Sequence, residues 1–306
     1  NFVAFATMHV LTHGNMFGSA SGWVISFASF PRTAKLVLDQ LTAPVAHYQI
    51  GVDKKFEPKN ALDEDLYALT SHYNATADTL RIELLNLKTK EIIHSWAHGK
   101  KTREIGGSHI NHPLLLDDNS VAYKMENSLY RMDSDSKLQW ANEEVKFHHS
   151  LEQDHEGFLW SPANLRNCEL DLNRRLPDPN KKLVYKDELI VKIDPGTGKI
   201  VYSKSLSEIF LENNYSGLVK GFWQYDPIHL NDIEPILEDS QYWKKGDLFL
   251  SCRNLHTVLL YRPTTGKILW LKTGLWANQH DVDIIDTARI SIFNNNINMS
   301  YYEVLH

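Results

Sequence analysis

The stretch DELIVKIDPGTGKIVY (Asp187–Tyr202) decides the fold of this 306-residue chain. Leu189, Val191 and Ile193 alternate with other residues, and a β-strand, whose side chains repeat with a period of two, places all three on one face. The turn Gly196-Thr197-Gly198 then reverses the chain into a short second strand. The stretch therefore predicts a β-hairpin with an apolar face.

The same pattern occurs three more times along the chain. It reads TLRIELLNLKTKEIIHSW (Thr79–Trp96), NSLYRMDSDSKLQW (Asn127–Trp140) and GDLFLSCRNLHTVLLYRPTTGKILW (Gly246–Trp270). The four copies place a lysine at the same point before the closing strand, at Lys90, Lys137, Lys199 and Lys267. Sheets repeated about 50 to 70 residues apart are typical of a β-propeller, in which each repeat forms one four-stranded blade. We therefore expect an all-β chain folded as a six-bladed β-propeller, of which about five blade units are visible.

Composition and charge exclude several classes of function. The net charge of -6 and the isoelectric point near 6.2 are not those of a nucleic-acid-binding protein, so we expect no nucleic-acid partner. The sequence has no Gly-rich phosphate loop and no HExxH motif, and we expect neither a cofactor nor a metal. Cys168 and Cys252 form no disulfide framework and no zinc motif, and their pairing stays open.

Residues 1–30 differ from the rest of the chain, because they contain no Lys, Arg, Asp or Glu. An uncharged apolar stretch of this length can span a bilayer, and we expect a helical signal anchor that associates with a membrane. The alternative is a buried segment that packs under the propeller. We place the boundary between this segment with its linker, residues 1–44, and the propeller domain, residues 45–306.

Two long insertions interrupt the repeats. Residues 166–186 are charged and contain proline, whereas residues 206–227 carry Tyr215, Phe222, Trp223 and Tyr225. Insertions in repeat folds usually form loops on one face, often the binding face. The aromatic insertion predicts either a wall for an aromatic ligand or a hydrophobic plug on the rim of the propeller, and the sequence favours neither.

Polar side chains recur at the start of the innermost strand of each blade. The stretches are INHPLLL (Ile110–Leu116), FHHSLEQD (Phe147–Asp154), IHLNDIEP (Ile228–Pro235) and NQHDVDII (Asn278–Ile285). Aligned on the apolar positions Leu114, Leu151, Ile233 and Val282, they superpose His112, His149, Asn231 and His280. Because the symmetry of a propeller directs equivalent positions at one axial cavity, the register predicts a shared functional site. Any one of these histidines alone would more often be a structural residue.

The succession FHH, IHLND, LSCRN and NQHDVDI, with KEIIHSW closing the first blade, resembles the bacterial arylsulfotransferase family of propellers over Gly51 to Asn296. The resemblance implies sulfuryl transfer from a phenolic sulfate ester to a phenolic acceptor through a covalent sulfohistidine, without a nucleotide sulfate donor. It implies a nucleophile at His280, supporting residues at His229 and Asn231, an arginine at Arg253, and a further histidine at His149 rather than His148. It also implies a periplasmic or extracellular location.

These residue types suit such chemistry. A neutral imidazole is a competent nucleophile near pH 7 because the ordinary pKa of histidine is about 6.5. Arg253 would place a fixed positive charge, and Asn231 a neutral donor, at the sulfuryl oxygens, where negative charge is stabilised in the transition state. His149 and His229 would hold oxygens or shuttle the proton of the phenol.

One departure from the family supports an alternative function. Family sequences commonly read FDNG after the nucleophile, whereas this chain reads FNNN (Phe293–Asn296) and so lacks the acidic residue and the glycine. If the acidic residue supports the site, its loss lowers activity. The alternative is a catalytically inactive propeller that serves as a binding or assembly scaffold at the cell envelope, alone or in an oligomer. A quinone-dependent dehydrogenase is disfavoured, because the chain lacks the Trp-rich docking phrase of those blades.

Overall fold

The structure is a computed structural model that describes residues 62–74, 77–101, 109–170, 183–220 and 225–295. The chain divides into two units, Asn1–Asn60 and Ala61–His306. The first unit lies outside the described residues, as do the predicted apolar helix and the predicted boundary after residue 44. Within the described ranges, no helix combines the length and the apolar character needed to cross a membrane.

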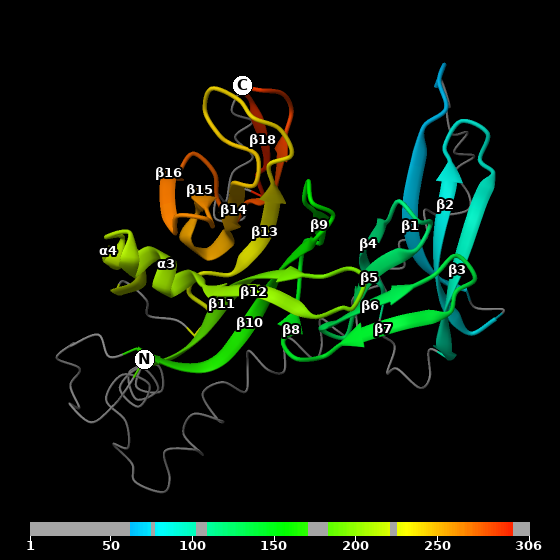
Figure 1. Ribbon diagram of the computed structural model, residues 1–306, viewed down its shortest axis with the longest axis horizontal. Coiled ribbons are helices and arrows are strands. Elements are labelled where there is room, and N and C mark those ends of the chain that lie inside the picture. Colours follow the sequence, from blue (N-terminus) through cyan, green and yellow to red (C-terminus); the bar gives the residue numbers. More distant parts are fainter. Residues whose placement is uncertain (1–61, 75–76, 102–108, 171–182, 221–224, 296–306) are drawn as a thin grey trace, which may run out of the picture. The chain divides into compact units, whose positions relative to one another are not determined.

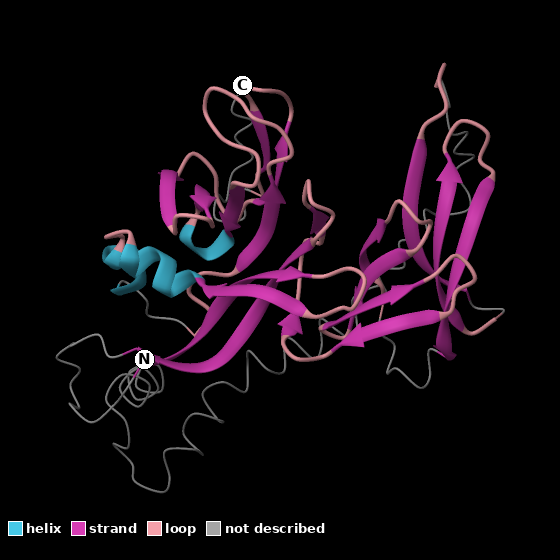
Figure 2. Cartoon of the chain, in the orientation of Figure 1, coloured by secondary structure: helices cyan, strands magenta, loops and turns pink. Residues whose placement is uncertain are grey.

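The described residues form antiparallel sheets that follow one another along the chain (Figures 1 and 2). The first sheet contains β1 (Tyr67–Asn74), β2 (Thr79–Asn86) and β3 (Ile92–Lys101), and the second contains β4 (Asn111–Leu115), β5 (Val121–Met125), β6 (Ser128–Met132) and β7 (Leu138–Asn142). The third contains β8 (Lys146–Phe147), β9 (Glu152–Gln153), β10 (Leu159–Leu170), β11 (Leu183–Ile193) and β12 (Ile200–Ser205). The fourth contains β13 (Leu230–Pro235), β14 (Leu248–Cys252), β15 (Thr257–Arg262) and β16 (Lys267–Thr273), and β17 (His280–Ile284) pairs with β18 (Ile290–Phe293).

The predicted hairpins are all present, as β2–β3, β6–β7, β11–β12 and β15–β16. Leu189, Val191 and Ile193 lie together in one buried layer, whereas Ile190 lies in the buried layer on the other face of β11. Both faces of this strand are therefore covered, as in a sheet stacked between two others. The prediction of a β fold is confirmed for the described residues, which are mostly strands accompanied by short helices. No closed ring is formed by the described residues, so the count of six blades stays a prediction.

A tryptophan on the last strand of each of the first two sheets is covered by the following sheet. Trp140 on β7 donates its Nε1–H to the carbonyl of Pro195 at 2.7 Å, in the turn between β11 and β12. The ring lies so close that a Cβ at Gly198 would approach it to 2.6 Å. Trp96 on β3 is likewise only 1% exposed. This recurring contact shows how one sheet stacks on the next.

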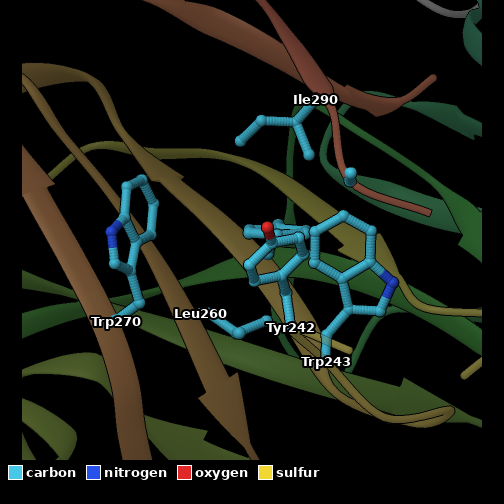
Figure 3. A pocket seen from close by; sticks show the side chains of 7 residues that line it. Tyr242, Trp243, Leu260, Trp270 and Ile290 are labelled. Carbon is cyan, nitrogen blue, oxygen red and sulfur yellow. The ribbon is translucent and has the colours of Figure 1, made fainter. Parts of the chain in front are cut away.

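Trp270 on β16 is the exception, since 41% of its surface is exposed. It borders an apolar cavity of about 340 Å³ between the fourth sheet and the β17–β18 hairpin (Figure 3). The cavity is also lined by Tyr242, Trp243, Phe249, Leu260, Ala288 and Ile290. Among the described residues, β17 and β18 pair with each other as a two-stranded sheet.

The first predicted insertion is not simply a loop. Residues 166–170 and 183–186 extend β10 and β11, which pair as far as Leu170 opposite Leu183, while residues 171–182 lie outside the described ranges. A long antiparallel ladder satisfies the backbone N–H and C=O groups of residues that the sequence analysis assigned to an irregular segment.

In the neighbouring sheet, Cys252 carries a buried free thiol.

The second insertion forms two short helices, α3 (Leu206–Glu212) and α4 (Ser216–Lys220). Ser205 caps α3, because its side chain accepts a hydrogen bond from the backbone N–H of Glu208. The apolar side chains of the two helices pack into the core that joins the third and fourth sheets, with Leu206, Ile209, Phe210 and Val219 fully buried. Of the two predicted roles, the helices therefore fulfil that of a hydrophobic plug. Phe222 and Trp223 lie outside the described residues.

Candidate functional site

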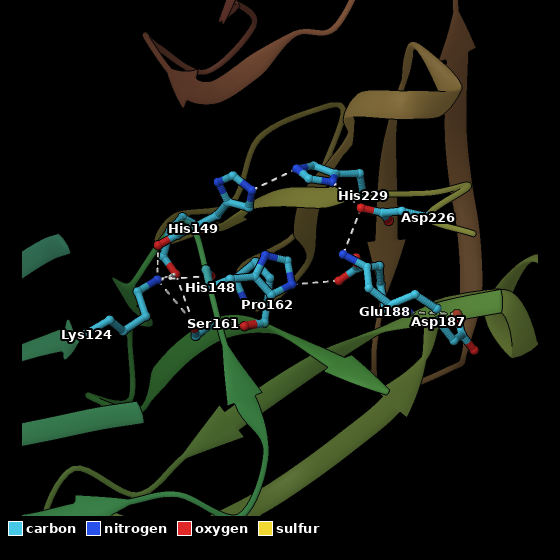
Figure 4. A network of polar contacts seen from close by, with 11 residues as sticks. Lys124, His148, His149, Ser161, Pro162, Asp187, Glu188, Asp226 and His229 are labelled. Carbon is cyan, nitrogen blue, oxygen red and sulfur yellow. Dashed lines mark hydrogen bonds and ion pairs between the residues drawn. The ribbon is translucent and has the colours of Figure 1, made fainter. Parts of the chain in front are cut away.

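Three of the predicted site histidines meet where β13 and β17 begin. The Nε2 atoms of His149 and His229 are 3.0 Å apart (Figure 4). The ring centroids of His149 and His280 are 5.8 Å apart, so His149 lies next to both of the others. These residues come from three successive sheets, since His149 lies between β8 and β9, His229 precedes β13, and His280 begins β17.

The backbone is held in an uncommon conformation at two of these histidines. His149 and His229 have φ angles of 51° and 53°, in the left-handed region, which costs a non-glycine residue of order 1–3 kcal/mol. The buried Lys124 on β5 stabilises the first of them, because its Nζ donates to the carbonyls of His148, His149 and Ser150. Strain of this kind persists only where the surroundings enforce it, and it is concentrated at functional sites.

His229 is supported by a chain of carboxyl and ammonium groups (Figure 4). Its Nδ1 lies 2.6 Å from Oδ2 of Asp226, which also lies 2.8 Å from Nζ of Lys186. Lys186 in turn lies 3.2 Å from Oε1 of Glu188. Although burial opposes it, hydrogen bonds from His229 and Lys186 lower the pKa of Asp226. Asp226 is therefore an ionised carboxylate that accepts the Nδ1–H of His229.

His148 points to a different partner from His149. Its Nε2 lies 2.7 Å from Oε2 of the buried Glu188. Burial, reinforced by the charge of Lys186, lowers the pKa of His148 to about 3, and burial raises the pKa of Glu188 to about 8. The geometry thus brings His149, as the resemblance implied, beside His229 and His280.

His280 is supported by uncharged groups. Its Nδ1 lies 3.1 Å from the carbonyl oxygen of Asn278 and 2.8 Å from Nδ2 of Asn295. Burial and the charge of Arg253 lower the pKa of His280, although the bond to Asn278 opposes them, so the ring is neutral at pH 7. Nδ1–H donates to the carbonyl of Asn278, which also accepts a hydrogen bond from Nδ2 of Asn295 at 2.8 Å, so the lone pair of Nε2 is free. That is the tautomer a nucleophile requires.

Arg253 and Asn231 lie beside these histidines in different ways. Arg253 begins the short helix η3 (Arg253–Leu255), and its backbone N–H donates to the carbonyl of His229 at 2.9 Å. Asn231 on β13 is only 3% exposed, and its Nδ2 donates to the carbonyl of Gln279 at 2.6 Å. This amide therefore ties β13 to the residue before His280, a role that the sequence analysis did not predict.

His112 does not join the other histidines, although the sequence register superposed it on them. It lies in β4 of the second sheet, whereas the cluster is built from the third sheet, the fourth sheet and the β17–β18 hairpin. No ring contact or hydrogen bond between described residues links His112 to His149, His229 or His280. The register therefore held for His149 and His280, and the contributing residue of the fourth sheet is His229, two positions before Asn231.

The FNNN departure preserves the hydrogen bonds of its loop. Asn294, at the place of the aspartate in FDNG, accepts the backbone N–H of Ala277 at 2.9 Å through Oδ1. A carboxylate oxygen could accept the same bond. The sequence analysis missed Asn295, and it also missed His256, whose Nδ1 accepts the N–H of Asn278 at 3.0 Å. Asn295 stands inside FNNN at the place of the asparagine in FDNG, whereas His256 stands in no recognisable motif and only the folded loop reveals it.

The candidate site is separate from the apolar cavity beside Trp270. The cavity beside Trp270 is lined by none of the clustered histidines. In the ranges that the structure covers, no group of three or more His, Cys, Asp or Glu side chains is arranged to hold a metal ion. The side chains of the histidine cluster and its supports are imidazole, carboxylate, amide and guanidinium groups.

Comparison with known proteins identifies the family but gives only weak structural neighbours. The WD40 β-propeller domain of Doa1 is 11% identical, with a TM-score of 0.46, and the match covers 76% of this chain and 59% of that chain. The β-propeller domain of Myceliophteria thermophila Cps50 (Swd1) is 9% identical (TM-score 0.41, 75% and 65% covered), and a streptogramin B lyase is 10% identical (0.40, 74% and 68%). This chain thus spans less than two thirds of the length of the first two.

No curated protein sequence matches the chain. The profile of the arylsulfotransferase (ASST) family, in contrast, matches residues 112–304, which make up well over half of the chain. The matched span contains His149, His229 and His280 together with Asn231 and Arg253. The protein therefore belongs to the arylsulfotransferase family.

Proposed function

We propose that this protein transfers a sulfuryl group from a phenolic sulfate ester to a phenolic acceptor, with His280 as the covalent carrier. The observation that carries the proposal is the meeting of a neutral His280 with the His149–His229 pair and the charge of Arg253. Membership of the arylsulfotransferase family supports the choice of phenolic substrates.

The first half of the reaction uses His280 as the nucleophile. Its Nε2 lone pair attacks the sulfur, the S–Nε2 bond forms, and the bond from sulfur to the phenolic oxygen breaks. The donor leaves as a phenolate, which takes a proton from solvent. The lowered pKa of His280 favours this step, because the attacking nitrogen is unprotonated at pH 7. Arg253 is the fixed cation that stabilises negative charge on the sulfuryl oxygens.

The second half returns the enzyme to its starting state. The acceptor phenol loses its proton to a base, its oxygen attacks the sulfur, and the S–Nε2 bond breaks with its electron pair returning to His280. The base must lie near His280, and the His149–His229 pair meets that requirement. The proton released here balances the proton taken up by the first phenolate.

The direct test is the release of a chromogenic phenol from its sulfate ester, with and without an added phenol. The native protein is expected to release the phenol faster when the acceptor is present, and His280→Ala is expected to abolish the release. Mass spectrometry of the protein treated with donor alone should show one added sulfuryl group, absent in the variant. Background signal from both folded proteins would reject the enzyme and leave the binding or assembly scaffold.

We further propose that the sheets are blades of a six-bladed β-propeller located in the periplasm or outside the cell, with residues 1–30 attached to a membrane. The four-stranded antiparallel second and fourth sheets, and the packing of Trp140 onto the next sheet, support the propeller. An experimental structure of the protein would test the number of blades. Protease accessibility in intact cells and fractionation after deletion of residues 1–30 would test the location and the attachment.

A further inference from the structure

We infer that Asp226 is a positioning residue that enables His229 and His149 to remove the proton of the acceptor phenol. The inference rests on the proposed function. Asp226 lies three residues before His229 and outside every motif that the sequence analysis quoted. Its Oδ2 contacts both Nδ1 of His229 and Nζ of Lys186 (Figure 4). A carboxylate held in this way fixes the tautomer and the orientation of an imidazole.

With a neutral His229, the hydrogen bonds leave one arrangement of protons in the pair. Because Asp226 is ionised and can only accept, Nδ1 of His229 donates across the 2.6 Å contact. A neutral His229 then has its lone pair on Nε2, so the hydrogen in the 3.0 Å contact belongs to Nε2 of His149. His149 is left with its lone pair on Nδ1. The pair can therefore accept a proton at His149 and pass another to His229.

The acceptor step balances in protons and electrons. The phenolic O–H breaks, and its proton goes to Nδ1 of His149 while the Nε2–H of His149 moves to Nε2 of His229. At the same time the new O–S bond forms and the S–Nε2 bond of sulfohistidine breaks. The positive charge rests on His229 beside the Asp226 carboxylate, and the proton then leaves to solvent. Burial lowers the pKa of His149 to about 2, so the charge does not remain there.

The surroundings of the pair explain why His229 and not His148 receives the charge. The carboxyl group beside His148 is that of Glu188, whose pKa is raised by burial, whereas the carboxyl group beside His229 is ionised Asp226. An ionised carboxylate stabilises an imidazolium, and a protonated acid does not. The charged and titratable groups around His229 are His148, His149, His280, Arg253, Asp226, Lys186 and Glu188.

The test is to compare the two half-reactions in Asp226→Asn. Single-turnover release of a chromogenic phenol without acceptor reports the first half, and turnover with a phenol acceptor reports the second. We expect the acceptor half to slow about 100-fold, the usual contribution of general acid–base catalysis, and the donor half to slow far less. The loss should be greatest for weakly acidic phenols and smallest for strongly acidic ones, because the latter need less help to lose a proton.

The pH profile and two further variants separate positioning from folding. Loss of the negative charge should move the acid limb of the acceptor half to lower pH, because a carboxylate favours the charged form of a neighbouring imidazole. Asp226→Glu should restore part of the acceptor rate. Glu156→Gln, which removes an exposed carboxylate paired with Lys192 at 2.7 Å, should leave both halves unchanged.

Three outcomes would overturn the inference. They are equal losses in both half-reactions, an acceptor loss that is independent of the acidity of the phenol, and an unchanged acceptor rate. If the native protein transfers no sulfuryl group, the proposed function fails instead. The tautomer of His229 by nitrogen NMR then still tests Asp226, since a native His229 protonated on Nε2 rather than Nδ1 would exclude the arrangement.

Discussion

His229 and His280 both lie next to His149, and their supports differ in charge. An ionised carboxylate, itself held by a lysine, accepts the Nδ1–H of His229. A backbone carbonyl and a side-chain amide surround Nδ1 of His280. A carboxylate stabilises the imidazolium form, whereas burial and a nearby arginine stabilise the neutral imidazole of His280. The same side chain is thus prepared for two tasks, holding a proton at one position and attacking sulfur at the other.

This difference matters because residue identity alone does not assign roles within a group of histidines. Environments that stabilise opposite protonation states are a general means of separating an acid or base from a nucleophile. In this cluster the two environments belong to His229 and His280, whose rings both contact the ring of His149. The separate roles of His229 and His280 can therefore be tested by removing each histidine in turn and by exchanging or removing the groups that contact it.

The largest effect is expected from removing the two histidines separately. His280→Ala should lower both half-reactions by about 10⁴-fold or more, as loss of a covalent nucleophile does in other enzymes. His229→Ala should slow the acceptor half by about 10²–10⁴-fold and the donor half much less. Rapid-mixing measurements of phenol release, with and without acceptor, would distinguish them. If both variants lose the same half-reaction to the same extent, the two histidines do not have separate roles.

The second effect concerns Arg253, which is expected to act in both halves. Arg253→Met should lower both rates by about 10²–10³-fold, the usual cost of removing one group that stabilises charge in a transition state. Arg289→Met is the matched control, because Arg289 is exposed and pairs only locally with Asp286. A loss confined to the acceptor half would place Arg253 with the base instead of with the sulfuryl oxygens.

Much of the fold could be predicted from the sequence because hairpins are local. Alternating apolar residues and a polar turn specify β11–β12 within sixteen residues, and the structure forms this hairpin. The extension of β10 and β11 could not be predicted, since charged residues and proline at 166–186 give no period-two pattern. Ring closure and blade count depend on pairings between distant segments, which local patterns do not encode.

The candidate site was predictable only where it coincided with a repeat or a family motif. His149, His229 and His280 lie in such motifs, and the structure brings them together. Asp226 and Lys186 lie at the ends of the two insertions, where no repeat constrains the sequence. His112 illustrates the opposite error, because an equivalent position in a repeat does not ensure a place in the site when only some sheets contribute.

A third prediction concerns the pH dependence of the donor half. The pKa of His280 lies below its ordinary 6.5, and the neutral form is the nucleophile. The fraction of neutral His280 falls only as the pH drops through that lowered pKa, so the rate should be constant above pH 6.5 and decline below it. Single-turnover rates of phenol release across this range would show the limb. A decline that begins above pH 6.5 would mean that the pKa of His280 is not lowered, and it would contradict the assignment of a neutral environment to this ring.

The smallest effect is expected from changing the neutral support itself. Asn295→Ala removes an amide that donates at 2.8 Å to the carbonyl of Asn278, the same carbonyl that accepts Nδ1–H of His280, and the loss of this hydrogen bond should slow the donor half by about 2- to 10-fold. Asn295→Asp should move the acid limb of that half to higher pH, because it gives His280 the kind of charged partner that His229 has. Asn294→Asp is the control, since Asn294 contributes a hydrogen bond to Ala277 that a carboxylate can keep. If Asn294→Asp shifted the limb as much as Asn295→Asp, general charge in the loop, and not the partner at Nδ1, would set the protonation of His280.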